Sequence, residues 1–380
     1  MHSEDRRCER CEVLPEVMEC GGTVLFVAMA GALEEKLMEI LRGFGCSPDY
    51  DRGAITCEVE SFKGLIERLA KTEGIGPLEA RDTHVLFLPR GKEENYTCLK
   101  NIRTLRELLD IVKEGQYMEV LRNRRITFHA QPVLRSSDLR VDGFEMLVRG
   151  LDEEGNLIPP LKLLESAERT NTLFYFDRMC REAAIRHAVS KLPSDSDAKI
   201  FVNFSPNSIY DPRFCMQSTL RVASEVGLKP GRLVFEIVET QKVEDLRHLR
   251  NIVQYYKQEG VLVAMDDMGR GYANLDMLVN LKPNIVKIDR EIVHGVSSDE
   301  VKRCVFHAIV DLCRRLEVEV LAEGVETEED FAFAFERVDL VQGYFLSKPS
   351  PDLGEAKLRA EETARRAVEG SRPGHGQRAC

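Results

Sequence analysis

The sequence has no apolar segment that is long enough to cross a lipid bilayer. Its longest uncharged apolar stretch covers only residues 23–33, whereas a membrane-spanning helix needs about 20 apolar residues. The first twelve residues, MHSEDRRCERCE, are highly charged and lack the apolar core of a secretory signal peptide. We therefore expect neither a membrane span nor an export signal.

An excess of positive charge is also missing. The formal net charge is −11 at pH 7, which argues against broad binding to nucleic-acid polymers or to membrane surfaces. A small anionic ligand is compatible with this charge, because a metal ion or an arginine can reverse the field inside a pocket.

The eleven cysteines are odd in number and scattered. Without an export signal, this usage is typical of reduced thiols in the cytoplasm. Cys8 and Cys11 form a C-x-x-C motif, with Cys20 and His2 nearby. Because a zinc site normally has four ligands at recognisable spacings, a loose polar tail over residues 1–20 is the favoured interpretation, and a metal site is the alternative.

A length of 380 residues suits about two domains, or a barrel with a smaller module. Residues 22–92 alternate between strand-like and helix-like stretches in the order β-α-β-α-β, which predicts a small α/β module over residues 21–95. A connecting segment over residues 96–118 follows, with a helix predicted over 99–116. At the other end, residues 367–380 have the composition of a disordered tail.

Eight short apolar runs, each followed by a helical stretch, occur between residues 119 and 366. They are ITFHAQPVL, GFEMLVRG, KIFVNFSP, RLVFEIVE, VLVAMDD, NIVKID, VEVLAEG and LVQGYF. Eight strands with intervening helices predict a (β/α)₈ barrel of the TIM type. The turn RSSDLRVD between the first two runs is too short for a parallel crossover. We therefore expect a modified barrel whose first strand is antiparallel.

These strands carry polar or charged residues where apolar ones are expected. The residues are Gln131, Glu145, Asn203, Glu236, Asp266, Asp267, Lys287, Glu323 and Gln342. Near the carboxyl ends of barrel strands, they would meet at one mouth. Unpaired carboxylates there would cost several kcal/mol each, so a compensating cation is expected.

Oxygen ligands of this kind suit Mg²⁺ or Mn²⁺. The adjacent Asp266 and Asp267 could hold two ions, with one carboxylate bridging them. Two ions about 4 Å apart can activate a water molecule and stabilise an in-line phosphoryl displacement. Lys287 could orient that water or neutralise developing charge.

Each of these residues also has an ordinary structural explanation. Glu236 could lie on the exposed face of an edge strand, and Asp266 with Asp267 could cap a helix. Lys287 could form a surface ion pair, and Asn203 could begin a turn. The repetition of one exception in successive strands favours a shared site.

Seven stretches in order resemble the signature motifs of the EAL-domain family. They are FEMLVRG, VNFSP, FEIVET, MDDMGRGYANL, NIVKIDR, LAEGVET and VQGYFLSKP, which together cover roughly residues 119–350. The resemblance implies a modified (β/α)₈ barrel that hydrolyses cyclic di-GMP to linear pGpG with two Mg²⁺ or Mn²⁺ ions and forms a homodimer through the barrel. Some members of the family only bind the nucleotide.

The resemblance also implies a role for each matching residue. Glu145, Asn203, Glu236 and Asp266 would hold the first metal, while Asp266 and Asp267 would hold the second. Lys287 would contact the attacking water, and Glu323 would act near the second metal. The residues implied to support the substrate or its metal shell are Gln131, Arg149, Glu326 and Gln342. Those implied to control the loop and the dimer contact are Glu239, Gly269, Arg270 and Gly271.

The chain departs from the family pattern at a few positions. Methionine stands at position 146, where the family signature has alanine, and glycine stands at position 150, where an aromatic is common. Met268 and Arg270 replace a usual phenylalanine and a small residue. Because no implied metal ligand is missing, an active phosphodiesterase is the first hypothesis. A cyclic di-GMP receptor without turnover, signalling through residues 22–116, is the second, and a purely structural interaction protein is the third. The N-terminal module contains no GGDEF-like string.

Overall fold

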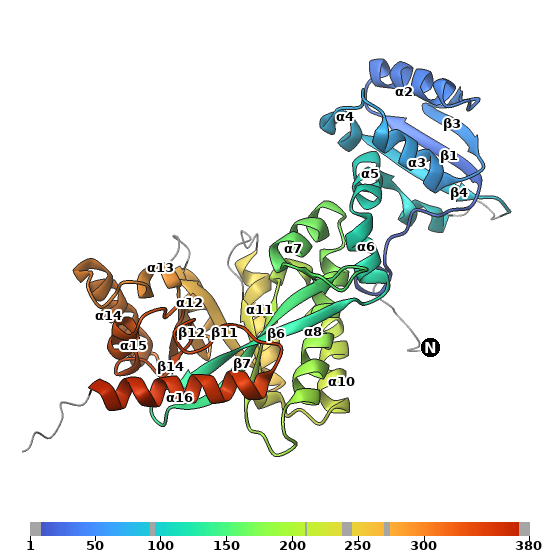
Figure 1. The fold of residues 1–380 in the computed structure, drawn as a ribbon. Coiled ribbons are helices and arrows are strands. Elements are labelled where there is room, and N and C mark those ends of the chain that lie inside the picture. The colour runs from blue at the N-terminus through green and yellow to red at the C-terminus, as the bar shows by residue number, and fades with distance from the viewer. Residues whose placement is uncertain (1–8, 92–95, 210, 238–244, 270–273, 372–380) are drawn as a thin grey trace, which may run out of the picture. The chain divides into compact units, whose positions relative to one another are not determined.

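The computed structural model describes the chain except for residues 1–8, 92–95, 210, 238–244, 270–273 and 372–380. It divides into two compact units (Figure 1). The first unit contains Met1–Arg125 and Leu151–Phe176, and the second contains Ile126–Gly150 and Asp177–Cys380.

A five-stranded antiparallel sheet forms the centre of the first unit. Its strands are β1 (Gly22–Ala28), β2 (Asp49–Asp51), β3 (Ala54–Val59), β4 (Thr83–Pro89) and β5 (Arg103–Thr104), in the spatial order β2-β3-β1-β4-β5. The helices are α2 (Gly31–Gly43), α3 (Phe62–Lys71) and the short α4 (Pro77–Arg81). The predicted small α/β module is confirmed, and its β-α-β-β-α-β order is the split arrangement of ferredoxin-like folds.

Alternation along the strands explains why the helices cover one face of this sheet. Val24 and Phe26 on β1 are fully buried, and Val85 and Phe87 on β4 lie on the same face. The buried residues of α2, at intervals of four, pack onto this face; they are Leu33, Leu37 and Leu41. Strand β2 was not predicted, because its three residues, DYD, are all exposed and have no apolar alternation.

The helix predicted over residues 99–116 is wrong as a single element. The segment forms a 3₁₀ turn (η1, Tyr96–Asn101), strand β5, α5 (Leu105–Lys113) and α6 (Gly115–Arg122). Thr104 and Glu107 form a capping box that begins α5. Glu114 separates the two helices and pairs with Arg169 of α7 (Pro160–Arg169) at 2.7 Å, and the next residue, Gly115, is a poor helix former.

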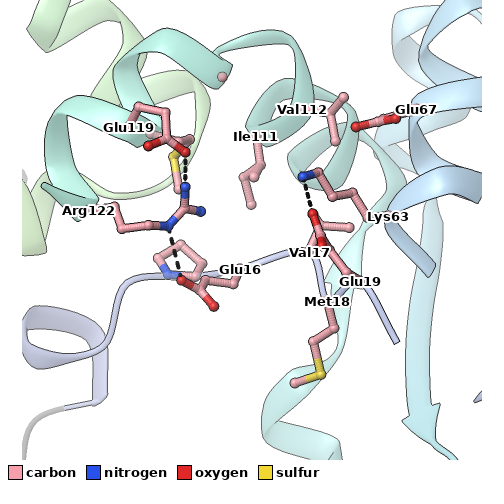
Figure 2. Close-up of a pocket in the computed structure, with 13 residues that line it drawn as sticks. Glu16, Val17, Met18, Glu19, Lys63, Glu67, Ile111, Val112, Glu119 and Arg122 are labelled. Carbon is pink, nitrogen blue, oxygen red and sulfur yellow. Dashed lines mark hydrogen bonds and ion pairs between the residues drawn. The ribbon is translucent and has the colours of Figure 1, made fainter. Parts of the chain in front are cut away.

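The N-terminal segment over residues 13–20 is attached to α3 and α6, and a short helix, α1 (Glu9–Glu12), precedes it. The Lys63 amide donates to the Met18 carbonyl at 2.9 Å, and the Lys63 ammonium pairs with Glu19 at 2.6 Å. Arg122 of α6 lies 3.4 Å from Glu16. Together with α5, these residues line a groove of about 540 Å³. Figure 2 shows how its lining side chains lie.

Eight strands of the second unit close into a barrel, which confirms the predicted fold. They are β6 (Ile126–Arg135), β7 (Arg140–Leu151), β9 (Lys199–Phe204), β10 (Leu233–Ile237), β11 (Leu262–Met268), β12 (Ile285–Ile288), β13 (Glu319–Ala322) and β14 (Leu340–Val341). Strand β6 is antiparallel to both of its neighbours, β7 and β14, and the other neighbouring pairs are parallel. The short turn after β6 therefore dictates the modified topology, as predicted.

Helices surround these strands (Figure 1). They are α8 (Leu173–Lys191), α9 (Pro212–Cys215), α10 (Gln217–Glu225), α11 (Leu246–Gln258), α12 (Asn274–Leu281), α13 (Arg290–Val293), α14 (Glu300–Arg315), α15 (Glu328–Phe335) and α16 (Leu353–Ser371). Three short elements complete the chain: β8 (Leu157–Ile158), η2 (Pro206–Ser208) and η3 (Pro230–Arg232). Helix α16 continues through residues 367–371, which were predicted as part of a disordered tail, and residues 372–380 lie outside the described chain.

Two further sequence expectations concern membranes and thiols. Over the described parts of the chain, no helix has both the length and the apolarity that a membrane span requires. The nine described cysteines are all free thiols. Cys8 and His2, named for the alternative metal site, lie outside the described residues, whereas Cys11 is buried and Cys20 is exposed.

Candidate active site

The polar residues of the barrel strands form a layer directly beyond its apolar interior. The interior is filled by one residue from each of seven strands: Val133, Phe201, Val234, Ala264, Ile285, Leu321 and Leu340. For each of these strands, a predicted polar residue lies two positions from the apolar interior residue. These polar residues are Gln131, Asn203, Glu236, Asp266, Lys287, Glu323 and Gln342. Side chains along a strand alternate with a period of two. A residue two positions from an inward-facing apolar residue therefore also faces the inside of the barrel.

Glu145 joins this layer from β7. It is paired in register with Gln131 on β6 and with Phe201 on β9. Gly143, two positions earlier, leaves the space that the Phe201 ring fills, since a Cβ at this glycine would lie 2.7 Å from that ring. Glu145 thus takes the polar position of its strand, while its neighbour on β9 fills the apolar layer.

Lys287 supplies the positive charge beside the aspartate pair. Its Nζ atom lies 2.6 Å from Glu236 Oε1 and 3.3 Å from Asp266 Oδ1. It also forms an ion pair with Glu323. The Lys287 side chain is only 1% exposed, so these contacts are screened from solvent. Lys287 is therefore a counter-ion within the acidic layer and does not form a surface pair.

The polar layer contains more carboxyl groups than positive charges. Burial lowers the pKa of Lys287, but attraction by the surrounding carboxylates outweighs burial and holds that pKa well above its usual value. Burial raises the pKa of Glu236 and of Glu323, against an opposing effect from Lys287. One ammonium cannot balance four carboxyl groups, so added positive charge would stabilise this site.

A chain of hydrogen bonds orients Glu145. The Asn203 amide donates to Glu145 Oε1 at 3.1 Å, and the Gln342 amide donates to Glu145 Oε2 at 2.8 Å. The Gln131 amide lies 3.5 Å from the Ser347 carbonyl oxygen. The structure thus brings together three predicted residues, from β7, β9 and the end of β14, around one carboxylate.

A bulge breaks the regular alternation at the aspartate pair. The register of β11 with β12 shifts between Met265 and Met268, and Asp267 has a left-handed backbone with φ of 55°. The Asp267 amide donates to Asp266 Oδ1 at 2.9 Å. In a regular strand these neighbouring side chains would lie on opposite faces; a bulge re-aims side chains and is frequent beside active sites.

The described residues partly fit a divalent cation. Glu236 Oε2 is buried without a hydrogen-bond partner in the described part of the molecule, and an unsatisfied buried oxygen of this kind suits a hard cation. No three His, Cys, Asp or Glu side chains of the described residues already stand in a metal-binding arrangement. Lys287 is the cation that contacts three of these carboxyl groups in this structure.

The mouth contains a pocket of about 270 Å³. Its lining residues are Gln131, Glu145, Arg290, Glu323, Gly324, Glu326, Gln342, Gly343 and Tyr344. Four of them were not predicted as site residues, and two of these four, Arg290 and Tyr344, have polar side chains. Arg290 pairs with Glu326 at 2.8 Å. Both could have been found from their motifs, because Arg290 directly follows VKID and Tyr344 stands within VQGYF.

Two predicted residues have positions that the sequence did not reveal. The Arg149 guanidinium donates to the Val148 carbonyl at 2.8 Å and is not among the lining residues of the mouth pocket. Gly269 has φ of 106°, and a Cβ there would lie 2.8 Å from Ile292 Cγ1, so only glycine fits this turn. The other loop residues that were singled out lie outside the described residues: Glu239, Arg270 and Gly271.

Comparison with known proteins agrees with this geometry. Residues 114–349 match the family model described as EAL domain. An uncharacterized signaling protein of Caulobacter vibrioides is 32% identical over 255 residues, which are 65% of this chain and 31% of the relative. The probable cyclic di-GMP phosphodiesterase PdeG of Escherichia coli is 28% identical over 239 residues, which are 61% of this chain and 46% of the relative. The chain therefore aligns with less than half of the length of these curated relatives.

A solved structure is similar to the barrel. The standalone versatile EAL protein of Vibrio cholerae, in its c-di-GMP-bound form, is 34% identical with a TM-score of 0.53, over 59% of this chain and 92% of that chain. The strand order, the acidic layer at the mouth and the match over residues 114–349 point to one conclusion. This chain belongs to the EAL domain family.

Proposed function

We propose that the barrel hydrolyses cyclic di-GMP to linear pGpG. The observation that carries the proposal is the acidic layer, in which Glu236, Asp266 and Glu323 surround the buried Lys287. The name of the Escherichia coli relative and the c-di-GMP-bound form of the Vibrio cholerae structure support this choice of substrate.

We propose that hydrolysis depends on two ions of Mg²⁺ or Mn²⁺, which oxygen ligands of this kind suit. Glu145, Asn203, Glu236 and Asp266 would hold the first, and Asp266 with Asp267 would hold the second. When bound, such ions lower the pKa of a water molecule and stabilise negative charge on phosphate oxygens.

The chain's own residues would position the reactants. Lys287 is held by its carboxylate partners, and its ammonium would orient a water molecule or neutralise developing charge. Glu323, which contacts Lys287, would accept a proton from that water. Gln342 and Asn203 keep the Glu145 carboxylate in one orientation, and Glu326 lines the mouth where substrate would enter.

A cyclic di-GMP receptor without turnover is the second candidate. It is favoured by the Lys287 contacts, because an ammonium among the carboxylates competes with a divalent cation for the same oxygens. Both candidates include a homodimer through the barrel, which sedimentation of the full chain would test.

Chromatography of nucleotides tests the two candidates directly. The full chain is incubated with cyclic di-GMP and Mn²⁺ or Mg²⁺, beside Glu145→Ala and the surface control Glu362→Ala, whose side chain is 62% exposed. Appearance of pGpG with wild type and the control, and its loss in Glu145→Ala, would support hydrolysis. Intact nucleotide that still binds to the wild type would support the receptor instead.

A further inference from the structure

The carboxyl end of β9 is held by the sheet on one side only. Pairing of β9 with β7 ends at Phe201, opposite Glu145. Pairing with β10 continues to Asn203 and Phe204. Asn203, which donates to Glu145, therefore lies beyond the part of β9 that is clamped between two strands.

A carboxylate from α8 holds the chain where the sheet does not. Asp177 Oδ1 accepts the Ser205 backbone amide at 2.9 Å, two residues beyond Asn203. Asp177 Oδ2 accepts the Ser208 hydroxyl at 2.6 Å. Both contacts fall on the turn formed by Ser205 and η2, so one side chain fixes the exit of β9.

The Asp177 carboxylate is buried together with its counter-ion. Arg181, one turn further along α8, forms an ion pair with Asp177. The Asp177 side chain is 8% exposed and the Arg181 side chain is 2% exposed. Arg181 Nε lies 3.4 Å from Thr219 Oγ1 on α10. The pair is thus anchored to a second helix as well as to the turn after β9.

A buried ion pair is a poor source of net stability. The desolvation cost of the two charges offsets much of their attraction, and apolar replacements of equal volume are often as stable. The pair contributes more to the orientation of the turn than to net stability, because the carboxylate forms directional hydrogen bonds to two donors of that turn.

We propose that Asp177, paired with Arg181, is a positioning residue that fixes the Ser205–Ser208 turn and thereby holds Asn203 beside Glu145 for metal binding. The inference rests on the proposed function, in which Asn203 is a metal ligand. Asp177 touches neither the metal nor the substrate in this proposal. It acts through the backbone that carries Asn203.

Mn²⁺ binding to the full chain, without nucleotide, tests the proposal. The signal of free Mn²⁺ in electron paramagnetic resonance gives the dissociation constant for wild type, Asp177→Asn and Ser208→Ala. We expect Asp177→Asn to weaken binding about tenfold, as removal of a group that orients a metal ligand commonly does, and Ser208→Ala to weaken it less. Excess Mn²⁺ should restore the turnover number of both variants.

The matched control is Arg186→Ala on the same helix, which removes an exposed pair with Glu225 and should leave Mn²⁺ binding unchanged. Variants that unfold at a lower temperature but bind Mn²⁺ like wild type would overturn the proposal and make Asp177 a purely structural residue. If Asp177→Asn does not fold, Ser208→Ala decides the question, since it keeps the ion pair. A wild type that binds Mn²⁺ but forms no pGpG would contradict the proposed hydrolysis and leave this test intact.

Discussion

Lys287 Nζ lies 2.6 Å from Glu236 Oε1, and neither side chain is more than 1% exposed to solvent. The contact joins β12 to β10, on the far side of β11. Among the described residues, Lys287 is the cation that contacts Glu236, Asp266 and Glu323. The sequence has two adjacent carboxylates, Asp266 and Asp267, directly after an apolar run, and therefore requires a compensating positive charge. Lys287 provides that charge. A lysine two strands from Glu236 provides compensation that no local sequence feature shows.

Replacing Lys287 with methionine should reduce both activity and stability. Loss of a fixed charge at a reaction centre typically costs about 10²–10³ in turnover number. Removal of one partner from a buried ion pair costs about 3–5 kcal/mol. Product formation and urea unfolding measure the two effects, with the exposed Lys357→Met on α16 as the control. Unchanged turnover in a folded Lys287→Met would exclude a role for the ammonium in catalysis.

Replacing Glu236 with glutamine should separate metal binding from folding. The variant keeps the shape of the side chain, and Lys287 retains Asp266 and Glu323 as partners. We expect stability without metal to stay within about 1–2 kcal/mol of wild type. The rise in unfolding temperature that saturating Mn²⁺ gives the wild type should disappear. Thermal unfolding with EDTA and with Mn²⁺ checks this; an equal Mn²⁺ effect in both proteins would remove Glu236 from the ligand set.

Stability without metal should fall as pH rises above the ordinary glutamate pKa of about 4.3. Burial raises the pKa of Glu236 and Glu323 in the folded state, so the folded state binds more protons than the unfolded state between the ordinary and the raised pKa. The free energy of unfolding therefore decreases with pH through that window. Chemical unfolding in EDTA across the window measures the slope, which should be shallower in Glu323→Gln. A slope identical to that of wild type would mean that Glu323 does not titrate there.

Mn²⁺ affinity should rise over the same range of pH. Protons and the cation compete for the same carboxylate oxygens, and the raised pKa values of Glu236 and Glu323 extend that competition above the ordinary range. Isothermal titration at several pH values gives the dependence. Affinity that does not change with pH would place the bound ion away from these two residues.

Replacing Gly343 with alanine should disrupt the mouth. A Cβ at this position would lie 2.0 Å from the Val325 carbonyl oxygen, and overpacking of this kind costs about 1–3 kcal/mol. Activity should also fall, since Gln342 is the preceding residue and orients Glu145. Gly231→Ala is the control, because its nearest neighbour would be 4.0 Å away. Equal unfolding temperatures for the two variants would show that the backbone yields easily at Val325.

Much of the barrel and its mouth follows from the sequence alone. The period of two along each strand places Glu236 two positions from the apolar Val234, and the same spacing recurs from β6 to β14. The short turn between Arg135 and Arg140 forces the antiparallel first pair. These are local properties, because strand periodicity and loop length act over a few residues.

Contacts between distant segments decided the rest. Closure of the barrel brings Lys287 to Glu236 and Arg290 to the mouth pocket. In the first unit, the strand order likewise depends on partners far away in sequence. The sequence determined which residues of the barrel strands form the polar layer, since that requires only the pleat of each strand. The tertiary structure decided which of those charges meet, because a side chain's partner depends on which strands the fold brings together.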